Sequence, residues 1–171
     1  MTNIYSLAAQ IIQYVFPLIK TRTESRPFNN LRINSLGVDV ALVKVALFIV
    51  QKILSDDVGL KYIGTTAHRS FVVGRVLANM VAALADAHLT EESSSRLLKH
   101  IIWCYLRLSD NSRAREALRT CLPDMLRDIT FSSGLREDLA TRSWLVHLLI
   151  KVQGPRFAFQ AGGGYEQMMV N

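Results

Sequence analysis

Hydrophobic residues recur along this chain at the three- and four-residue intervals of a single helical face. The pattern is clearest over residues 96–122, where two apolar stripes flank the short polar run 109–112. The first stripe holds Leu97, Ile101, Cys104, Tyr105 and Leu108, and the second holds Ala114, Ala117, Leu118, Cys121 and Leu122. Serine, aspartate and asparagine between them are typical caps of a helix start, because their side chains accept hydrogen bonds from its first amides. The pattern therefore predicts two amphipathic helices joined by a tight capped turn.

The same spacing predicts helices over most of the remaining chain, and no run alternates with the period of a strand over more than a few residues. The predicted ranges are about 4–16 or 4–20, 28–54 with an alternative break near Lys44, 56–63, 67–87 and 137–152, and Thr90 is the predicted N-cap of the helix that ends at Leu108. After Pro123 the pattern is looser, and the glycine-rich residues 153–171 are predicted to form a flexible tail behind one helical domain, residues 1–152. Amphipathic helices with brief links favour an all-α solenoid of helical repeats.

Composition narrows the class of protein. A chain of 171 residues with 50% hydrophobic content suits one domain with a sizeable core. The net charge of +6 favours acidic partners, such as nucleic acid or acidic protein segments. Both cysteines fall on apolar helix faces and, without a secretory segment, predict a reducing compartment. The most apolar stretch, 36–54, is interrupted by Asp39 and Lys44, so no membrane span is expected.

Three stretches resemble a known family: RPFNNLRINSLG at 26–37, VQKILSDDVGLKYI at 50–63 and RLLKHIIWCYLRLSDNSRAREALRTCLPDMLRD at 96–128. They resemble the armadillo-repeat subunit of the carbon catabolite repression–NOT (CCR-NOT) deadenylase complex, the "required for cell differentiation" family. The resemblance covers roughly residues 8–152 and implies an armadillo-like solenoid. Family members have further helices before the start of this chain. They also carry on the order of thirty more residues at Lys44, most of one repeat of ~40–47. The chain thus resembles a shortened paralogue or isoform, truncated and with part of one repeat missing near Lys44.

The resemblance implies a non-enzymatic adaptor in mRNA decay, RNA-mediated silencing, and translation and transcription regulation. Such a subunit docks on the large scaffold subunit of the complex. It also captures tryptophan-containing peptide segments of decay and silencing factors in shallow surface pockets. The corresponding location is the cytoplasm, including P-bodies, and the nucleus.

The resemblance carries three pocket arginines over to this chain, Arg69, Arg96 and Arg113. A guanidinium plane can stack on an indole face, which suits capture of a tryptophan side chain. Where the family has a tyrosine two residues before the first arginine, this chain has Ala67. The loss of one aromatic wall removes about 0.5–1.5 kcal/mol of stacking, so tryptophan capture stays an open question for this chain.

Trp103 and Arg107 share the polar stripe of their helix with Arg96 and are further candidates for partner contact. Trp103 stands where the family tends to have a basic residue, and its alternative role is to cover a gap left by missing helices. The basic segment 96–119 can serve as a surface that tracks phosphates in single-stranded RNA. Its alternative is a solvated face with salt bridges to Asp110 and Glu116.

Candidate chemistry is sparse. His100 and Cys104 are four residues apart on a helix, but no second ligand pair accompanies them, so no metal is expected. The sequence contains no nucleophile or phosphate-loop motif, which predicts neither an enzyme nor a cofactor. Two hypotheses therefore compete with the adaptor: a basic solenoid that binds single-stranded RNA, and a degenerate paralogue that no longer joins the complex. The apolar ends of a shortened solenoid also suit homodimer formation.

Overall fold

The computed structural model describes residues 32–86 and 91–154, and every regular element in these ranges is helical. The all-α class predicted from the sequence is confirmed. The helices are α2 (Arg32–Ser55), α3 (Asp57–Gly64), α4 (Ala67–Asp86), α5 (Glu91–Leu108), α6 (Ser112–Cys121), a 3₁₀ turn at Asp124–Leu126, α7 (Ser132–Glu137) and α8 (Leu139–Gln153).

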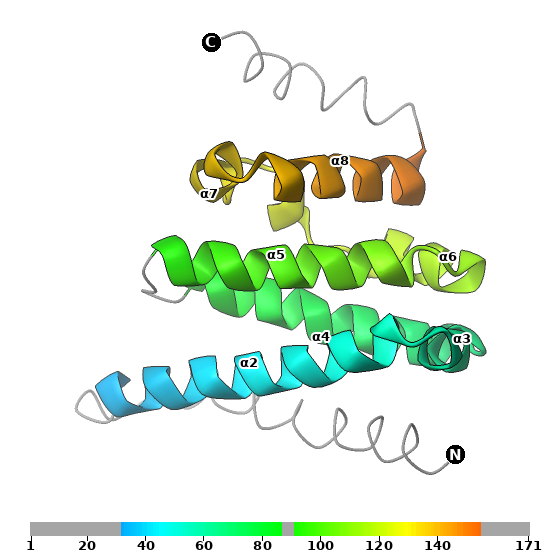
Figure 1. Cartoon of the computed structure of the whole chain (residues 1–171), viewed down its shortest axis with the longest axis horizontal. Coiled ribbons are helices and arrows are strands. Elements are labelled where there is room, and N and C mark those ends of the chain that lie inside the picture. The colour runs from blue at the N-terminus through cyan, green and yellow to red at the C-terminus, as the bar shows by residue number, and fades with distance from the viewer. Residues whose placement is uncertain (1–31, 87–90, 155–171) are drawn as a thin grey trace, which may run out of the picture.

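Helices α2, α5 and α8 run in the same direction, one above the next, and form one layer of the molecule (Figure 1). Helix α5 lies in the middle of this layer and packs against both of its neighbours. Helices α4 and α6 pack against each other, and each also contacts a helix of the first layer. Each unit thus buries its apolar face on the next one, which is the organisation of an armadillo-like solenoid.

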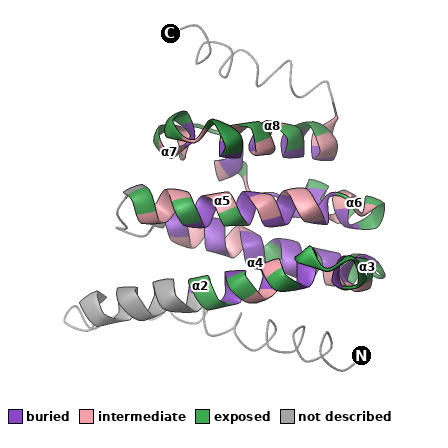
Figure 2. Cartoon of the chain, in the orientation of Figure 1, coloured by how far each residue is buried: buried purple, intermediate pink, exposed green. Residues whose placement is uncertain are grey.

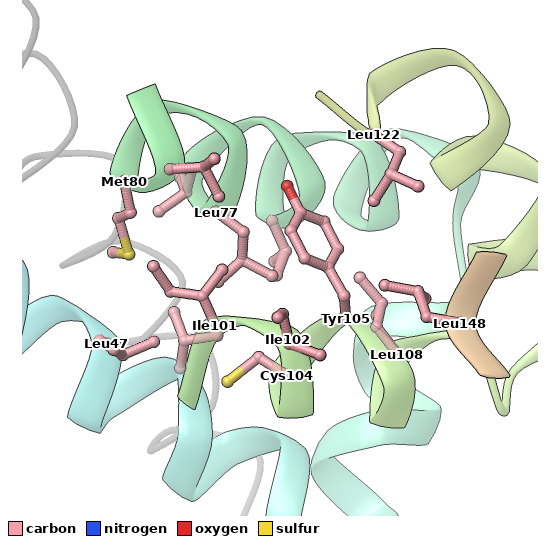
Figure 3. Packing of buried hydrophobic residues seen from close by; sticks show 14 of the residues in the cluster. Leu47, Leu77, Met80, Ile101, Ile102, Cys104, Tyr105, Leu108, Leu122 and Leu148 are labelled. Atoms are coloured by element: carbon pink, nitrogen blue, oxygen red, sulfur yellow. The ribbon is translucent and has the colours of Figure 1, made fainter. Parts of the chain in front are cut away.

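A single cluster of buried side chains runs through these helices (Figure 2). The helical face predicted for α5 is confirmed, since all its predicted core residues are buried. The buried residues include Leu97, Ile101, Cys104, Tyr105 and Leu108 on α5, and Val73, Val76, Leu77, Met80, Val81 and Leu84 on α4. Figure 3 shows Leu77 and Met80 of α4 opposite Ile101 and Tyr105 of α5. The core therefore lies between the two layers.

Tyr105 is the largest fully buried side chain of this core. Its hydroxyl donates a hydrogen bond to the Gly74 carbonyl oxygen at 3.0 Å, so the polar edge of the ring is satisfied inside the core. Burial raises the pKa of this phenol well above its usual value, and burial likewise raises the pKa of the Cys104 thiol to about 12. Gly74 is needed at this crossing, because a Cβ there would lie 2.5 Å from Cys121 Sγ.

The capped turn between α5 and α6 is confirmed. Asn111 is the N-cap of α6, and its side-chain oxygen accepts hydrogen bonds from the amides of Arg113 and Ala114, both at 3.1 Å. Gly64 makes room for this cap, because a Cβ at Gly64 would lie 2.1 Å from the Asn111 side-chain nitrogen. Asp56 caps α3 in the same way by accepting from the Val58 amide. Short polar side chains thus fix where these helices begin.

The structure differs from the predicted elements at three places. Helix α2 runs without interruption through Lys44, so the alternative break there is wrong. The segment after Pro123 contains the 3₁₀ turn and the short helix α7. The last helix begins at Leu139 instead of Glu137, because Asp138 serves as its N-cap and Glu137 closes α7. The predicted helix over 4–20, the predicted cap Thr90 and the predicted tail from residue 155 onward lie outside the described residues.

Asp138 links α8 to α5 through hydrogen bonds that favour its charged form. It accepts from Lys99 Nζ at 2.8 Å and from the Thr141 amide at 3.0 Å, and the Lys99 hydrogen bond is the main reason that the pKa of Asp138 falls from 3.8 to about 2. A carboxyl with a lowered folded-state pKa stabilises the fold above its unfolded pKa and loses this effect as the pH falls toward the folded value.

We expect Asp138→Ala to lower the free energy of unfolding by about 1–2 kcal/mol near neutral pH, the range for loss of an N-cap. Urea unfolding measured from pH 7 downward should show this difference shrinking between about pH 4 and pH 2, where Asp138 becomes protonated. A difference that does not depend on pH would show that the carboxylate charge contributes nothing.

Candidate partner-binding surface

The structure separates the five predicted site residues into two groups. Arg69 and Arg113 lie near the starts of α4 and α6, whose first turns meet beside the α3–α4 junction. Arg96, Trp103 and Arg107 lie along α5. Arg96 and Arg107 are about 16 Å apart along the helix axis, at 1.5 Å per residue. The five side chains therefore do not form one pocket.

At the α3–α4 junction, the guanidinium of Arg69 lies over the ring of Tyr62, 4.2 Å from its centroid. Arg113 donates a hydrogen bond from Nη1 to the Thr65 carbonyl oxygen, which ties α6 to the same junction. Ala67 is exposed at the first position of α4. The aromatic face beside Arg69 is thus supplied by Tyr62 of α3. The sequence pattern gave no sign of this contact, because the two residues belong to different helices.

Arg107 joins three helix ends. Its Nε donates to the Leu54 carbonyl oxygen at 3.1 Å, and its other nitrogens pair with Asp110, at 3.1 Å, and with Asp57. The hydrogen bond with Asp110 is the main reason that the pKa of Arg107 is raised. Only 27% of the Arg107 side chain is exposed, so it ties the end of α2 and the start of α3 to the end of α5. Its predicted contact with a partner remains a prediction.

We expect Arg107→Leu to lower the free energy of unfolding by about 1.5–3 kcal/mol, the range for hydrogen bonds to charged groups. The matched control is Arg136→Leu, which changes an exposed arginine of α7. Equal urea midpoints for the two variants would contradict the assignment of Arg107 to a structural joint.

Three further cations of segment 96–119 are paired with carboxylates. Lys99 pairs with Asp138 at 2.8 Å, Arg119 pairs with Glu116 at 2.8 Å, and Arg96 pairs with Glu92. The predicted salt bridges to Asp110 and Glu116 are therefore confirmed. Trp103 is half-buried and packs against the core, and its contact with a partner remains a prediction. Four of the six lysines and arginines of this segment are thus paired with carboxylates, which weakens its attraction for phosphates, while Arg113 and Arg115 donate to backbone carbonyl oxygens.

A second surface on α2 was not identified from the sequence. Val45 is 57% exposed and Phe48 is 59% exposed, although both belong to the most apolar stretch of the chain. They share one helix face with the exposed Lys52, whose Nζ lies 5.5 Å from the Phe48 ring centroid, and the exposed Lys44 adjoins them. We call these four residues the α2 stripe; the exposed part of α2 is visible beside its buried part in Figure 2. Periodicity missed it because residues 45–50 are apolar on every side of the helix.

Two other possible functions find no support in the described ranges. None of their helices is both long enough and apolar enough to cross a lipid bilayer. Residues 32–86 and 91–154 contain no cluster of three or more histidine, cysteine or acidic side chains that could hold a metal. Cys104 is fully buried whereas His100 is exposed, so this pair does not converge on one ligand position.

Comparison with known proteins gives the family. The model of the "Cell differentiation family, Rcd1-like" matches residues 1–46 and 44–152. The "Cell differentiation protein rcd1" of Schizosaccharomyces pombe is 44% identical over 183 residues, which cover 88% of this chain and 63% of that protein. The "Protein CAF40" of Saccharomyces cerevisiae is 41% identical over 177 residues, which cover 84% of this chain and 46% of that protein. The chain thus spans less than two thirds of the length of either relative.

The alignments also indicate where this chain lacks part of one repeat. The two matched segments of the family model meet at residues 44–46, the place predicted from the sequence. The 183 positions aligned with the fission-yeast protein exceed the part of this chain that they cover, about 150 residues, by about 33, against an armadillo repeat of about 40–47. Helix α2 passes through this seam as one continuous helix. The chain belongs to the Rcd1-like cell differentiation family.

Proposed function

We propose that this protein is a non-enzymatic adaptor of the CCR-NOT mRNA deadenylase complex. It docks on the large scaffold subunit and recruits peptide segments of mRNA-decay or silencing factors, in the cytoplasm and the nucleus. Family membership supports its place in the complex. The observation that carries the recruiting role is the α2 stripe.

The α2 stripe has the chemistry of a helix-docking site. Two large apolar side chains, Val45 and Phe48, are more than half exposed, and burying such side chains completely is worth about 1.5–3 kcal/mol each. Lys44 and Lys52 flank them along the helix and are both exposed. An amphipathic helix with apolar anchors at i, i+3, i+4 and i+7 and acidic residues at its ends would complement this stripe.

The position of the seam explains why the α2 stripe is open. The alignment with the fission-yeast relative is about 33 positions longer than the part of this chain that it covers. The two family-model matches meet at residues 44–46, directly at the α2 stripe. Helices of a solenoid bury their faces on the neighbouring repeat, so the removal of one neighbour leaves an uncovered face. Two copies packed face to face would oppose their own lysines, and this repulsion favours an acidic partner helix over a homodimer.

For tryptophan-containing segments, the α3–α4 junction is the proposed place of contact. Arg69 already stacks on Tyr62 at 4.2 Å, and Arg113 is held nearby by the Thr65 carbonyl oxygen. An indole can extend this stack on the guanidinium face that points away from Tyr62. Ala67 adds no aromatic wall, so we expect this contact to be weaker than docking on the α2 stripe.

Direct RNA binding is the second candidate and has less support, because four of the cations between Arg96 and Arg119 are paired with carboxylates. RNA affinity would fall steeply with salt concentration. Docking of apolar anchors would respond to salt only through the flanking lysines.

Fluorescence anisotropy with a designed peptide tests the recruiting role. The probe is an amphipathic helix with leucines at i, i+3, i+4 and i+7 and glutamates at both ends, and its control carries lysines in place of the glutamates. We expect saturable binding of the acidic probe by the full chain and clearly weaker binding of the lysine version. Equal affinity for both peptides, or no saturation with either, would contradict the proposed recognition.

A further inference from the structure

A cavity of about 260 Å³ lies between the end of α4, the first turns of α5, and α7 with the residues before it. Leu84, Leu98 and Phe131 give it an apolar floor. Helix α7 closes one side through Gly134, since a Cβ there would lie 2.5 Å from Ser95 Oγ. None of the described residues that line the cavity is charged.

Four residues with hydroxyl groups also line the cavity: Ser94, Ser95, Thr130 and Ser133. None of the four hydroxyls has a hydrogen-bond partner within the described ranges. Ser94 and Ser95 are half-buried, whereas Thr130 and Ser133 are exposed. A ligand with a polar edge would therefore find donors and acceptors that the fold itself does not use.

We propose that this cavity binds one uncharged aromatic side chain with a hydrogen-bonding edge, of the tyrosine kind, from an extended segment of a partner protein. Its volume lies below the roughly 300–1,000 Å³ of small-molecule sites, which suits a single side chain. The apolar floor takes the ring, and the hydroxyls of Ser94 and Ser95 meet its polar edge. Ile129, which is 77% exposed and adjoins Thr130 of the cavity, offers an apolar contact to the neighbouring residue of the segment. None of these residues belongs to the α2 stripe, so the site does not depend on docking there.

The test is a titration of the full ¹⁵N-labelled chain with N-acetyl-L-tyrosinamide, followed by two-dimensional NMR. We expect saturable shifts of the Ser95 and Gly134 amides with a dissociation constant in the millimolar range. N-acetyl-L-phenylalaninamide should bind about two- to tenfold more weakly, the change that one net hydrogen bond produces. Equal affinities would overturn recognition by the hydroxyls, and the absence of saturable shifts would overturn the site itself.

A pair of matched variants distinguishes binding in this cavity from nonspecific binding elsewhere on the surface. Ser133→Phe fills the mouth of the cavity from an exposed position on α7, whereas Ser143→Phe makes the same change at an exposed position on α8 that does not line it. We expect both variants to keep the wild-type melting temperature and only Ser133→Phe to lose tyrosinamide binding. Unchanged binding by Ser133→Phe would overturn the proposal.

Discussion

Replacing Tyr105 with alanine should lower the free energy of unfolding by about 3–5 kcal/mol, the range for removal of a buried aromatic ring. The ring is fully buried between α4 and α5, so the change leaves a cavity in the centre of the core. It also removes the hydrogen bond to the Gly74 carbonyl oxygen. Because small domains have only about 5–15 kcal/mol of stability in total, we expect a large fall in the urea midpoint.

Two controls divide this effect into its parts. Tyr105→Phe keeps the ring and loses only the hydroxyl, for which about 1–2 kcal/mol is expected. Phe71→Ala removes a ring that is 40% exposed on α4, so a much smaller loss is expected. A loss below about 1 kcal/mol for Tyr105→Ala would contradict the central place of this residue in the core.

Phe48→Asp should weaken binding of the acid-flanked probe peptide by at least about tenfold, which corresponds to about 1.4 kcal/mol. The substitution removes the largest apolar contact of the α2 stripe and sets a carboxylate against the glutamates of the peptide. Because Phe48 is 59% exposed, the fold should tolerate the change. The measurement is fluorescence anisotropy, with circular dichroism to confirm that the variant is folded.

Val58→Asp is the matched control, since Val58 is 61% exposed on α3 and does not belong to the α2 stripe. We expect this variant to bind like the wild type. Lys52→Glu should shift the preference toward the lysine-flanked peptide, because it reverses one flanking charge of the stripe. Equal losses of peptide affinity for Phe48→Asp and Val58→Asp would contradict the assignment of the α2 stripe as the docking site.

The sequence allowed the core to be predicted well because amphipathic periodicity is a local signal. The spacing of residues 97–108 gave the correct buried face of α5, and the polar run 109–112 gave the correct turn before α6. The alternative prediction of a helix break near Lys44 is wrong. Breaks in a helix usually have a local cause, such as a proline, a capping residue or a steric clash, and the sequence beside Lys44 contains no such signal. The predicted start of α8 lies two residues before the observed one. Hydrophobic spacing alone does not show which polar residue is the N-cap, and here it is Asp138.

The candidate site was less predictable because it depends on contacts between helices. The pairing of Arg69 with Tyr62, and of Arg107 with Leu54 and Asp57, joins residues whose neighbourhood no periodicity reveals. Exposure of Val45 and Phe48 depends on which neighbouring helices cover α2. An apolar run on a continuous helix predicts burial, and only the arrangement of the neighbouring helices shows which side remains open.

The adaptor role is tested most directly by mixing the chain with the docking segment of the large scaffold subunit and measuring the mass of the complex by gel filtration with light scattering. The proposal predicts an equimolar complex that forms at low salt and persists at high salt, both for the wild type and for Arg113→Ala, because the Arg113 side chain is engaged with the Thr65 carbonyl oxygen. A chain that is folded by circular dichroism but elutes alone at both salt concentrations would contradict the adaptor role.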